Sequence, residues 1–377
     1  MASAASVELP QFKGRPGWEF TDISALDLAA YTPVTEAQPA EPAQALFDLP
    51  APAGLPDGVI VAPIAQAPPE LLGSLVSADD VFTTLNDSAQ YRDGAFVYVP
   101  RGVVVTEPIS LRTVHAQAGT LLHQRTLIVL EEGAQATVWE QYLSAQPDQD
   151  ALLNVVTELV VGNGANLRYV CGQALSEHSW IFGAQRAQVG RDASLDWVAL
   201  GLGSRRGRVR METRLAGEGA NARVTGAYAP HGRQHVDFDT TQEHAAPHTT
   251  SDLAFRGVLA ERSTAVWKGN IIVDPGAQKT DAFQESRNLL VSKRAHADAI
   301  PGLEIQANDV RCTHAAAVAQ VDPEQLFYLR SRGLREDVAK RLVIEGFLAA
   351  LVERFEAGPV REQLADVLER RLATVLD

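Results

Sequence analysis

The residue types best suited to chemistry lie close together near the C-terminal end of the chain, in the sequence Cys312-Thr-His314. The residues from Val310 to Ala315 alternate as in a β-strand, in which every second side chain points to the same face. The Cys312 thiol and the His314 imidazole are therefore expected side by side. A thiolate and an imidazole suit iron or an iron–sulfur cluster, but two ligands do not complete four positions, so something else must supply the rest. Cys312 has an alternative role as a small buried side chain, and Cys171 is expected in the core.

A weaker candidate for metal binding lies in a histidine-rich stretch. In a strand His235, Asp237 and Asp239 share one face, which gives one nitrogen and two oxygen donors for a divalent metal. One strand alone rarely completes a metal site. The alternative is that these side chains make ordinary hydrogen bonds on the outer surface of a sheet.

The acidic residues also fit a carbohydrate-active β-helix enzyme. Asp281 and Glu285, with Asp237 and Asp239, could supply the pair of carboxylates that glycoside hydrolysis requires. Against this hypothesis, aromatic residues are only 6% of the chain, and none accompanies these acids to stack on sugar rings. We expect Glu285 to form an ion pair with Arg287 instead. Because a P-loop and the common hydrolase and metalloprotease motifs are missing from the sequence, we expect a non-catalytic protein whose partner uses any ATP.

The charge, the cysteine content and the apolar runs of the chain indicate which classes of protein to expect. The 377 residues include 33 basic and 47 acidic side chains, and the net charge is -14. A phosphate backbone binds a basic surface, so a nucleic-acid partner is not expected. Two cysteines cannot form a disulfide framework, the first residues do not have the pattern of a signal peptide, and no apolar run reaches the ~18 residues of a membrane helix. We therefore expect a cytoplasmic protein without a membrane segment.

The chain divides into three parts at the level of sequence. Residues 1–90 contain many prolines and predict an irregular and partly helical N-terminal part, in which Trp18 and Phe20 pack on the body. Residues 91–321 consist of short β-branched runs separated by Gly, Asn, Asp or Pro, which is typical of β-structure. Residues 322–377 carry apolar stripes at helical spacing and predict a C-terminal helical domain.

A corner built on a small residue returns through the β-rich part. Its spacings are 31, 28, 27, 44 and 31 residues, and the corners are Ala134, Ala165, Ala193, Ala220, Thr264 and Ala295. Stacked coils of a β-solenoid produce such spacing. On spacing alone a β-sandwich is an open alternative, although its turns recur more closely, about every 8 to 12 residues.

The switch from strand to helix is marked at Asp322 and Pro323, which suit an N-cap and the first helical position. Gly333 is expected to end this helix. The helices that follow either cap the open end of the solenoid or bind a partner.

Several strings in the second half of the chain resemble the SufB/SufD family of iron–sulfur cluster assembly scaffolds, and within it SufD. They are SDLAFRGVL, PGAQKTDAFQESRNLL, HADAIPGLEI, CTHAAAV and QLFYLRSRG, in this order. The resemblance implies a right-handed parallel β-helix with an N-terminal mixed part and a C-terminal helical domain. It also implies a SufB-like partner and a SufC ATPase, with a nascent cluster forming where a SufB cysteine faces a SufD histidine.

His314 matches that histidine by its place in the Cys-x-His motif. The resemblance implies that the C-terminal helices bind SufC, and the residues expected at this contact are Phe327, Tyr328, Leu329, Arg330 and Arg332. No cofactor is expected to bind tightly to this chain alone; a transient iron–sulfur cluster or iron is expected at the partner interface, and the sequence says nothing about a flavin. A SufB-like homodimer that builds the cluster itself is the alternative function.

Overall fold

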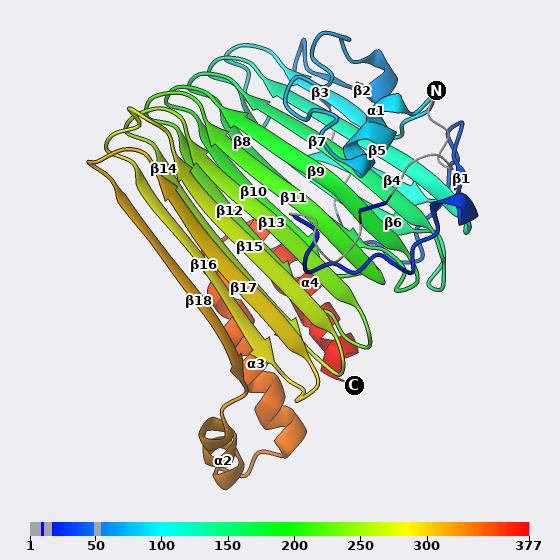
Figure 1. Ribbon diagram of the computed structural model, residues 1–377, viewed down its shortest axis with the longest axis vertical. Helices are drawn as coiled ribbons and strands as arrows, with labels where there is room; N and C mark the ends of the chain where they lie inside the picture. Colours follow the sequence, from blue (N-terminus) through cyan, green and yellow to red (C-terminus); the bar gives the residue numbers. More distant parts are fainter. Residues whose placement is uncertain (1–8, 11–16, 49–53, 377) are drawn as a thin grey trace.

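The body of the protein is a parallel β-solenoid (Figure 1). In the computed structural model, which describes residues 9–10, 17–48 and 54–376, successive strands from β3 onward alternate between two sheets. Each strand pairs in parallel with the strand two further along the chain, so two strands make one coil. The predicted fold class is confirmed, and the β-sandwich alternative is wrong because sandwich sheets are antiparallel.

The 10-stranded sheet contains the odd-numbered strands and β2, which runs antiparallel to β3. Its members are β1 (Thr32–Pro33), β2 (Ile60–Pro63), β3 (Ala95–Val99), β5 (Thr120–Leu130), β7 (Leu152–Val161), β9 (Trp180–Val189), β11 (Arg206–Leu215), β13 (His235–His244), β15 (Thr264–Val273) and β17 (His296–Ile305). The 8-stranded sheet contains β4 (Ile109–His115), β6 (Gln135–Ser144), β8 (Asn166–Ala174), β10 (Ser194–Gly201), β12 (Asn221–Tyr228), β14 (Thr250–Leu259), β16 (Asp281–Leu290) and β18 (Arg311–Gln320).

One edge of the solenoid is formed by a repeated corner. A residue with left-handed backbone lies two positions before β6, β8, β10, β12, β14 and β16, and these residues are Gly133, Gly164, Asp192, Gly219, His248 and Lys279. The next residue in each corner is small and buried, as Ala134 and Ala165 are. Glycine adopts the left-handed conformation without steric cost, which explains its frequency here.

Two of the six predicted corners do not belong to this edge. Thr264 is the first residue of β15, and Ala295 precedes β17, so both lie at the opposite edge. At this edge too a small buried residue precedes several strands, as Ser179, Ser263 and Ala295 do, so the sequence pattern did not distinguish the two edges. The equivalent residues on the first edge are Thr249 and Thr280, which are buried.

Much of the N-terminal part lies on the outer face of the 10-stranded sheet, whereas Leu46 and Phe47 pack on the outer face of the 8-stranded sheet. We call residues 17–34 the N-terminal strap. Trp18 is buried and packs against Phe82 and Phe182, with ring centroids 5.7 and 5.9 Å away, which confirms its predicted role. The prediction for Phe20 is wrong, because 41% of its surface is exposed.

Short helices complete this N-terminal part. They are η2 (Leu28–Ala30), η3 (Ile64–Gln66) and α1 (Val81–Ser88). The α1 helix begins with a capping box, in which the Asp80 side chain accepts from the backbone of Thr83 and the Thr83 hydroxyl accepts from Asp80 N–H.

The C-terminal helices are α2 (Pro323–Ser331), α3 (Glu336–Val352) and α4 (Pro359–Leu376). The side chain of Asp322 caps α2 by accepting from Glu324 N–H, as expected. The apolar faces of α3 and α4 pack on the outer face of the 8-stranded sheet, where Leu348 and Leu368 join a cluster with Val170. The helices therefore lie along the side of the solenoid rather than over its end, and the alternative that they cap the open end does not hold. None of the described helices is long and apolar enough to cross a membrane.

Candidate functional site

The last coil of the solenoid, formed by β17 and β18, is uncovered. β17 ends the 10-stranded sheet and β18 ends the 8-stranded sheet, so each is hydrogen-bonded to a strand on one side only. Ile305 and Val318 continue the inward-facing rows of the solenoid, yet each is 43% exposed. Because unpaired strand edges with apolar side chains readily pair with another chain, this end is a candidate interface.

Cys312 and His314 lie on β18 in this uncovered coil. In the parallel register Cys312 is next to Ala282 and His314 is next to Gln284, and both of these β16 side chains are buried inside the solenoid. Cys312 and His314 therefore share the inward face, as predicted, but no further coil covers them. The His314 side chain is exposed and able to meet a partner.

The two side chains of the motif differ in their surroundings. Cys312 is half-buried beside Ile271 and Val273, and this burial, together with the nearby Asp281 carboxylate, raises the pKa of its thiol. A raised pKa disfavours the thiolate that binds metals. His314 is thus the more accessible ligand of the pair. In the part of the chain that the structure describes, no group of three or more His, Cys, Asp or Glu side chains could hold a metal ion.

His235, Asp237 and Asp239 share the outer face of β13, as predicted, but the protein itself supplies their partners. The hydroxyl of Thr21 in the N-terminal strap lies 3.0 Å from His235 Nε2 and donates to Asp237 Oδ2. Arg208 pairs with Asp237 at 3.4 Å and with Asp239 at 2.7 Å. These contacts fasten the strap to the sheet, while metal binding by this set stays a prediction.

Burial shifts the protonation of this cluster. It lowers the pKa of His235 to about 4, because a charged imidazole loses its water, and the nearby guanidinium of Arg206 acts in the same direction. Burial also raises the pKa of Asp237 to about 6, against the opposing effect of Arg208. Near neutral pH the strap is therefore held by a neutral imidazole and an ionised carboxylate.

The carboxylates proposed for a carbohydrate-active enzyme do not meet. Asp237 and Asp239 face outward from the 10-stranded sheet, whereas Asp281 and Glu285 face outward from the 8-stranded sheet on the opposite side. The predicted ion pair of Arg287 with Glu285 is confirmed, with Nε and Oε2 2.9 Å apart. The four carboxylates therefore cannot form one site, and the two on the 10-stranded sheet, Asp237 and Asp239, are both paired with Arg208.

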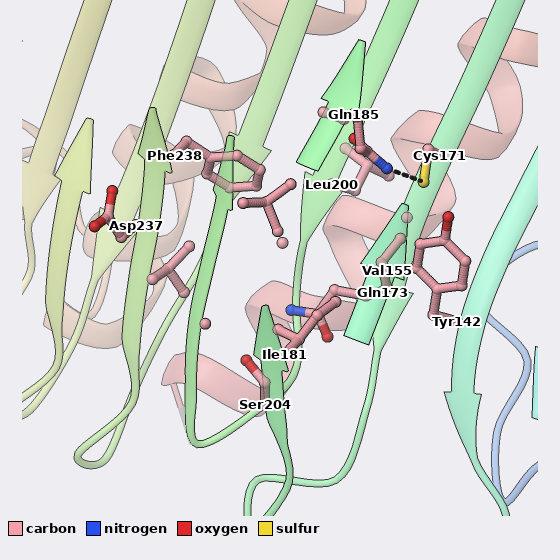
Figure 2. A pocket seen from close by; sticks show the side chains of 16 residues that line it. Tyr142, Val155, Cys171, Gln173, Ile181, Gln185, Leu200, Ser204, Asp237 and Phe238 are labelled. Atoms are coloured by element: carbon pink, nitrogen blue, oxygen red, sulfur yellow. Dashed lines mark hydrogen bonds between the residues drawn. The ribbon is translucent and has the colours of Figure 1, made fainter. Parts of the chain in front are cut away.

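Cys171 lies inside the solenoid, as expected (Figure 2). Its sulfur accepts a hydrogen bond from Gln185 Nε2 at 3.7 Å and lines a small internal cavity with Tyr142 and Ser204. Burial raises the pKa of its thiol to about 12, and the buried Glu140 carboxyl adds to the shift. Cys171 therefore stays protonated and apolar in character.

The α2 helix projects beyond the coils (Figure 1), and none of its residues is buried. Phe327 is 74% exposed and Tyr328 is 57% exposed. The guanidinium of Arg332 stacks on the Tyr328 ring at 5.2 Å, and Arg330 pairs with Glu336 at 3.5 Å. An exposed aromatic pair beside arginines is a candidate protein-binding surface, and Leu329, only half-buried, lies on the same helix.

The exposed inward-facing row of the last coil was not predicted from the sequence. The inward row of β17 continues through Ala299, Pro301 and Leu303 to Ile305. The alternation of apolar residues in β17 is visible in the sequence. Residues in an inward-facing row are normally buried in a core, so their exposure was not expected. Only the absence of a following coil shows that it is exposed.

The fold and this end define the class of protein: a β-solenoid whose exposed last coil and projecting helix are suited to assembly with other chains. A family model described as the SufBD core domain of SUF system FeS cluster assembly matches residues 113–347, more than half of the chain. The chain belongs to the SufB/SufD family, and it takes part in iron–sulfur cluster assembly by the SUF system.

Relatives named SufD place the chain within that family. It is 35% identical to the iron–sulfur cluster assembly protein SufD of Bacillus subtilis over 299 residues, which cover 79% of this chain and 68% of the relative. It is 30% identical to SufD of Escherichia coli over 300 residues, covering 78% and 70%. A SufBD family protein of Mycobacterium tuberculosis is 30% identical over 323 residues, covering 84% and 80%. The chain is thus most like SufD.

Proposed function

We propose that this chain is a non-catalytic SufD-like scaffold subunit that pairs with a SufB-like subunit through its last coil. The observation that carries the proposal is the uncovered inward row of β17 and β18, on which His314 is exposed. A second solenoid that stacked on this end would bury Ile305 and Val318 and satisfy the free strand edges.

In such a complex His314 faces the partner. A neutral imidazole binds iron, and the remaining ligands come from the SufB-like subunit, because the described part of this chain provides no complete set. The iron–sulfur cluster is the cargo of the assembly rather than a resident cofactor. ATP is hydrolysed by a SufC-type subunit, which docks on α2.

The test of the cluster site is His314→Ala, with Thr313→Ala as the matched control. Both side chains are exposed on β18 but point to opposite faces. We expect either change to alter the free energy of unfolding by no more than about 1 kcal/mol, as at other exposed sites. His314→Ala should leave pairing with the SufB-like subunit intact and abolish cluster formation on reconstitution with iron and sulfide. Normal cluster formation in an intact His314→Ala complex would refute the assigned role.

The test of the ATPase contact is Phe327→Ala, with Phe20→Ala as a control at an exposed phenylalanine elsewhere. We expect Phe327→Ala and Arg332→Glu to weaken SufC binding in a pull-down while SufB pairing persists. Unchanged binding in both variants would show that α2 is not the contact. Recovery of a homodimer without SufB or SufC from the native cell would favour the alternative, a chain that carries out the SufB role itself.

A further inference from the structure

Three arginines form a column along one edge of the solenoid. Arg233, Arg262 and Arg294 each lie two residues before a strand of the 10-stranded sheet, namely β13, β15 and β17, and all three are exposed. The turns that carry them are stacked, since Arg262 N–H donates to Gly232 O at 3.0 Å. Neighbouring strands in a sheet are about 4.8 Å apart, so the three positively charged side chains extend from successive coils at about this spacing.

The arginine column has no ion-pair partner within the described residues, although the protein carries an excess of acidic residues. In the part of the chain that the structure describes, the exposed Glu261 next to Arg262 forms no ion pair either, and Lys293 adds a further positive charge beside Arg294. Several exposed basic residues elsewhere are paired, as Arg101 is with Glu132 at 2.9 Å and Lys279 is with Asp309, while Arg205 and Arg332 stack on aromatic rings instead. Like charges on neighbouring coils repel each other, so the arginine column lowers stability unless another molecule neutralises its charge.

The position of the arginine column relates it to the C-terminal helices. β18 ends at this same edge, and the chain continues from there into α2. A hollow joins the column to the start of α3; it is lined by Arg294 and Ser292 from the turn and by Glu336 and Val338 from the helix. A partner bound to α2 therefore lies next to the arginine column.

We infer that the ATPase partner that docks on α2 also covers the arginine column with an acidic surface of its own. The inference rests on the proposed function, because it takes α2 as the docking helix. Complementary charges of this kind mainly accelerate association and fix the orientation of the bound partner, while an aromatic anchor such as Phe327 limits dissociation. The arginine column is thus a second, electrostatic part of the same interface.

The experiment compares Arg233→Glu/Arg262→Glu with the control Arg101→Glu/Arg191→Glu, which makes the same change in net charge at turns elsewhere on the solenoid. Association of the full chain with the purified SufC-type subunit is measured at several salt concentrations. We expect the column variant to bind at least about tenfold more slowly at low salt and to show a weaker salt dependence, while the control stays within about twofold. Circular dichroism should be unchanged, because all four side chains are exposed. The free energy of unfolding of the column variant should not fall, because the substitutions remove repulsion between like charges.

The results of these binding experiments can refute the inference and the proposed function independently. Loss of binding in Phe327→Ala with unchanged association of the column variant would overturn the inference and keep α2 as the docking helix. Unchanged binding in both variants would overturn both. A column variant that changes only self-association of this chain, or only its retention of inorganic phosphate, would also overturn the inference. Arg233→Gln/Arg262→Gln should give an intermediate loss, since it removes the positive charge without introducing a negative one.

Discussion

The buried ion pair of Arg125 with Glu158 should be among the most important polar contacts for stability. The two side chains are 3% and 0% exposed, and Arg125 Nη2 lies 2.8 Å from Glu158 Oε2. The Glu158 carboxylate also accepts from the backbone N–H groups of Gly73, Leu75 and Val76 at 3.0, 2.8 and 3.1 Å. One carboxylate on β7 thus holds a whole loop of the N-terminal part against the sheet.

Glu158→Ala would leave the buried Arg125 guanidinium with Asp87, 3.5 Å away, as its one remaining ion-pair partner among the described residues, and three backbone donors without their acceptor. Removing one partner of a buried pair costs about 3–5 kcal/mol. We expect a loss of this size in the free energy of unfolding. The control is Glu132→Ala, which breaks a pair of nearly equal length, 2.9 Å, between side chains that are 74% and 54% exposed. Exposed pairs contribute about 0–1 kcal/mol, so the control should lose less than that.

The assay is urea unfolding of both variants, combined with hydrogen exchange of the amides at Gly73, Leu75 and Val76. In Glu158→Ala these amides should exchange much faster, because their acceptor is gone. Equal stability of the two variants, with protection of the three amides preserved, would refute the reasoning. It would mean that water enters the site and solvates Arg125 at little cost.

The other predictions concern acid stability and two glycines. Burial lowers the pKa of His244 to about 4. The neutral imidazole therefore stabilises the fold fully above the unfolded pKa of about 6.5, and this stability is lost as the pH falls through 4. His244→Gln should flatten the decline of the free energy of unfolding between these pH values, and an unchanged slope would contradict the assignment. Gly183→Ala would place a Cβ 1.8 Å from the carbonyl oxygen of Val155 and should destabilise the protein by about 1–3 kcal/mol or more in urea unfolding. Gly346→Ala in α3, where a Cβ meets open space, should instead stabilise by up to about 1 kcal/mol, and a loss there would show that the helix is strained.

The repeating parts of the fold were predictable because their signals are local. A coil needs a small buried residue at each corner and β-branched residues between corners, and both requirements are visible within about 30 residues. The start of α2 at Asp322 and the pair of Glu285 with Arg287 are likewise fixed by residues close in sequence. The assignment of corners to two edges failed because Ala220 and Ala295 satisfy the same steric rule on opposite sides.

The contacts that could not be predicted join distant segments. Thr21 meets His235 and Asp237 across 214 and 216 residues, and no pattern near Thr21 marks these partners. The apolar stripes of α3 and α4 show that one face is buried, but not that the face lies on the side of the solenoid instead of its end. For the candidate site, the shared face of Cys312 and His314 followed from alternation, whereas the exposure of His314 depends on where the coils stop.

The N-terminal strap also bears on the order of folding. Within the solenoid each strand pairs with one a single coil away, so coils can form one after another from any starting point. The strap is different, because its Thr21 finds its partners only after β13 has formed, long after residues 17–34 have left the ribosome. We therefore expect the strap to dock late, and until then the surface of Phe182 and Trp180 that α1 does not cover stays open to solvent and to other chains. Residues 17–34 are thus made before the strand that holds them and are expected to be among the last to reach their native position.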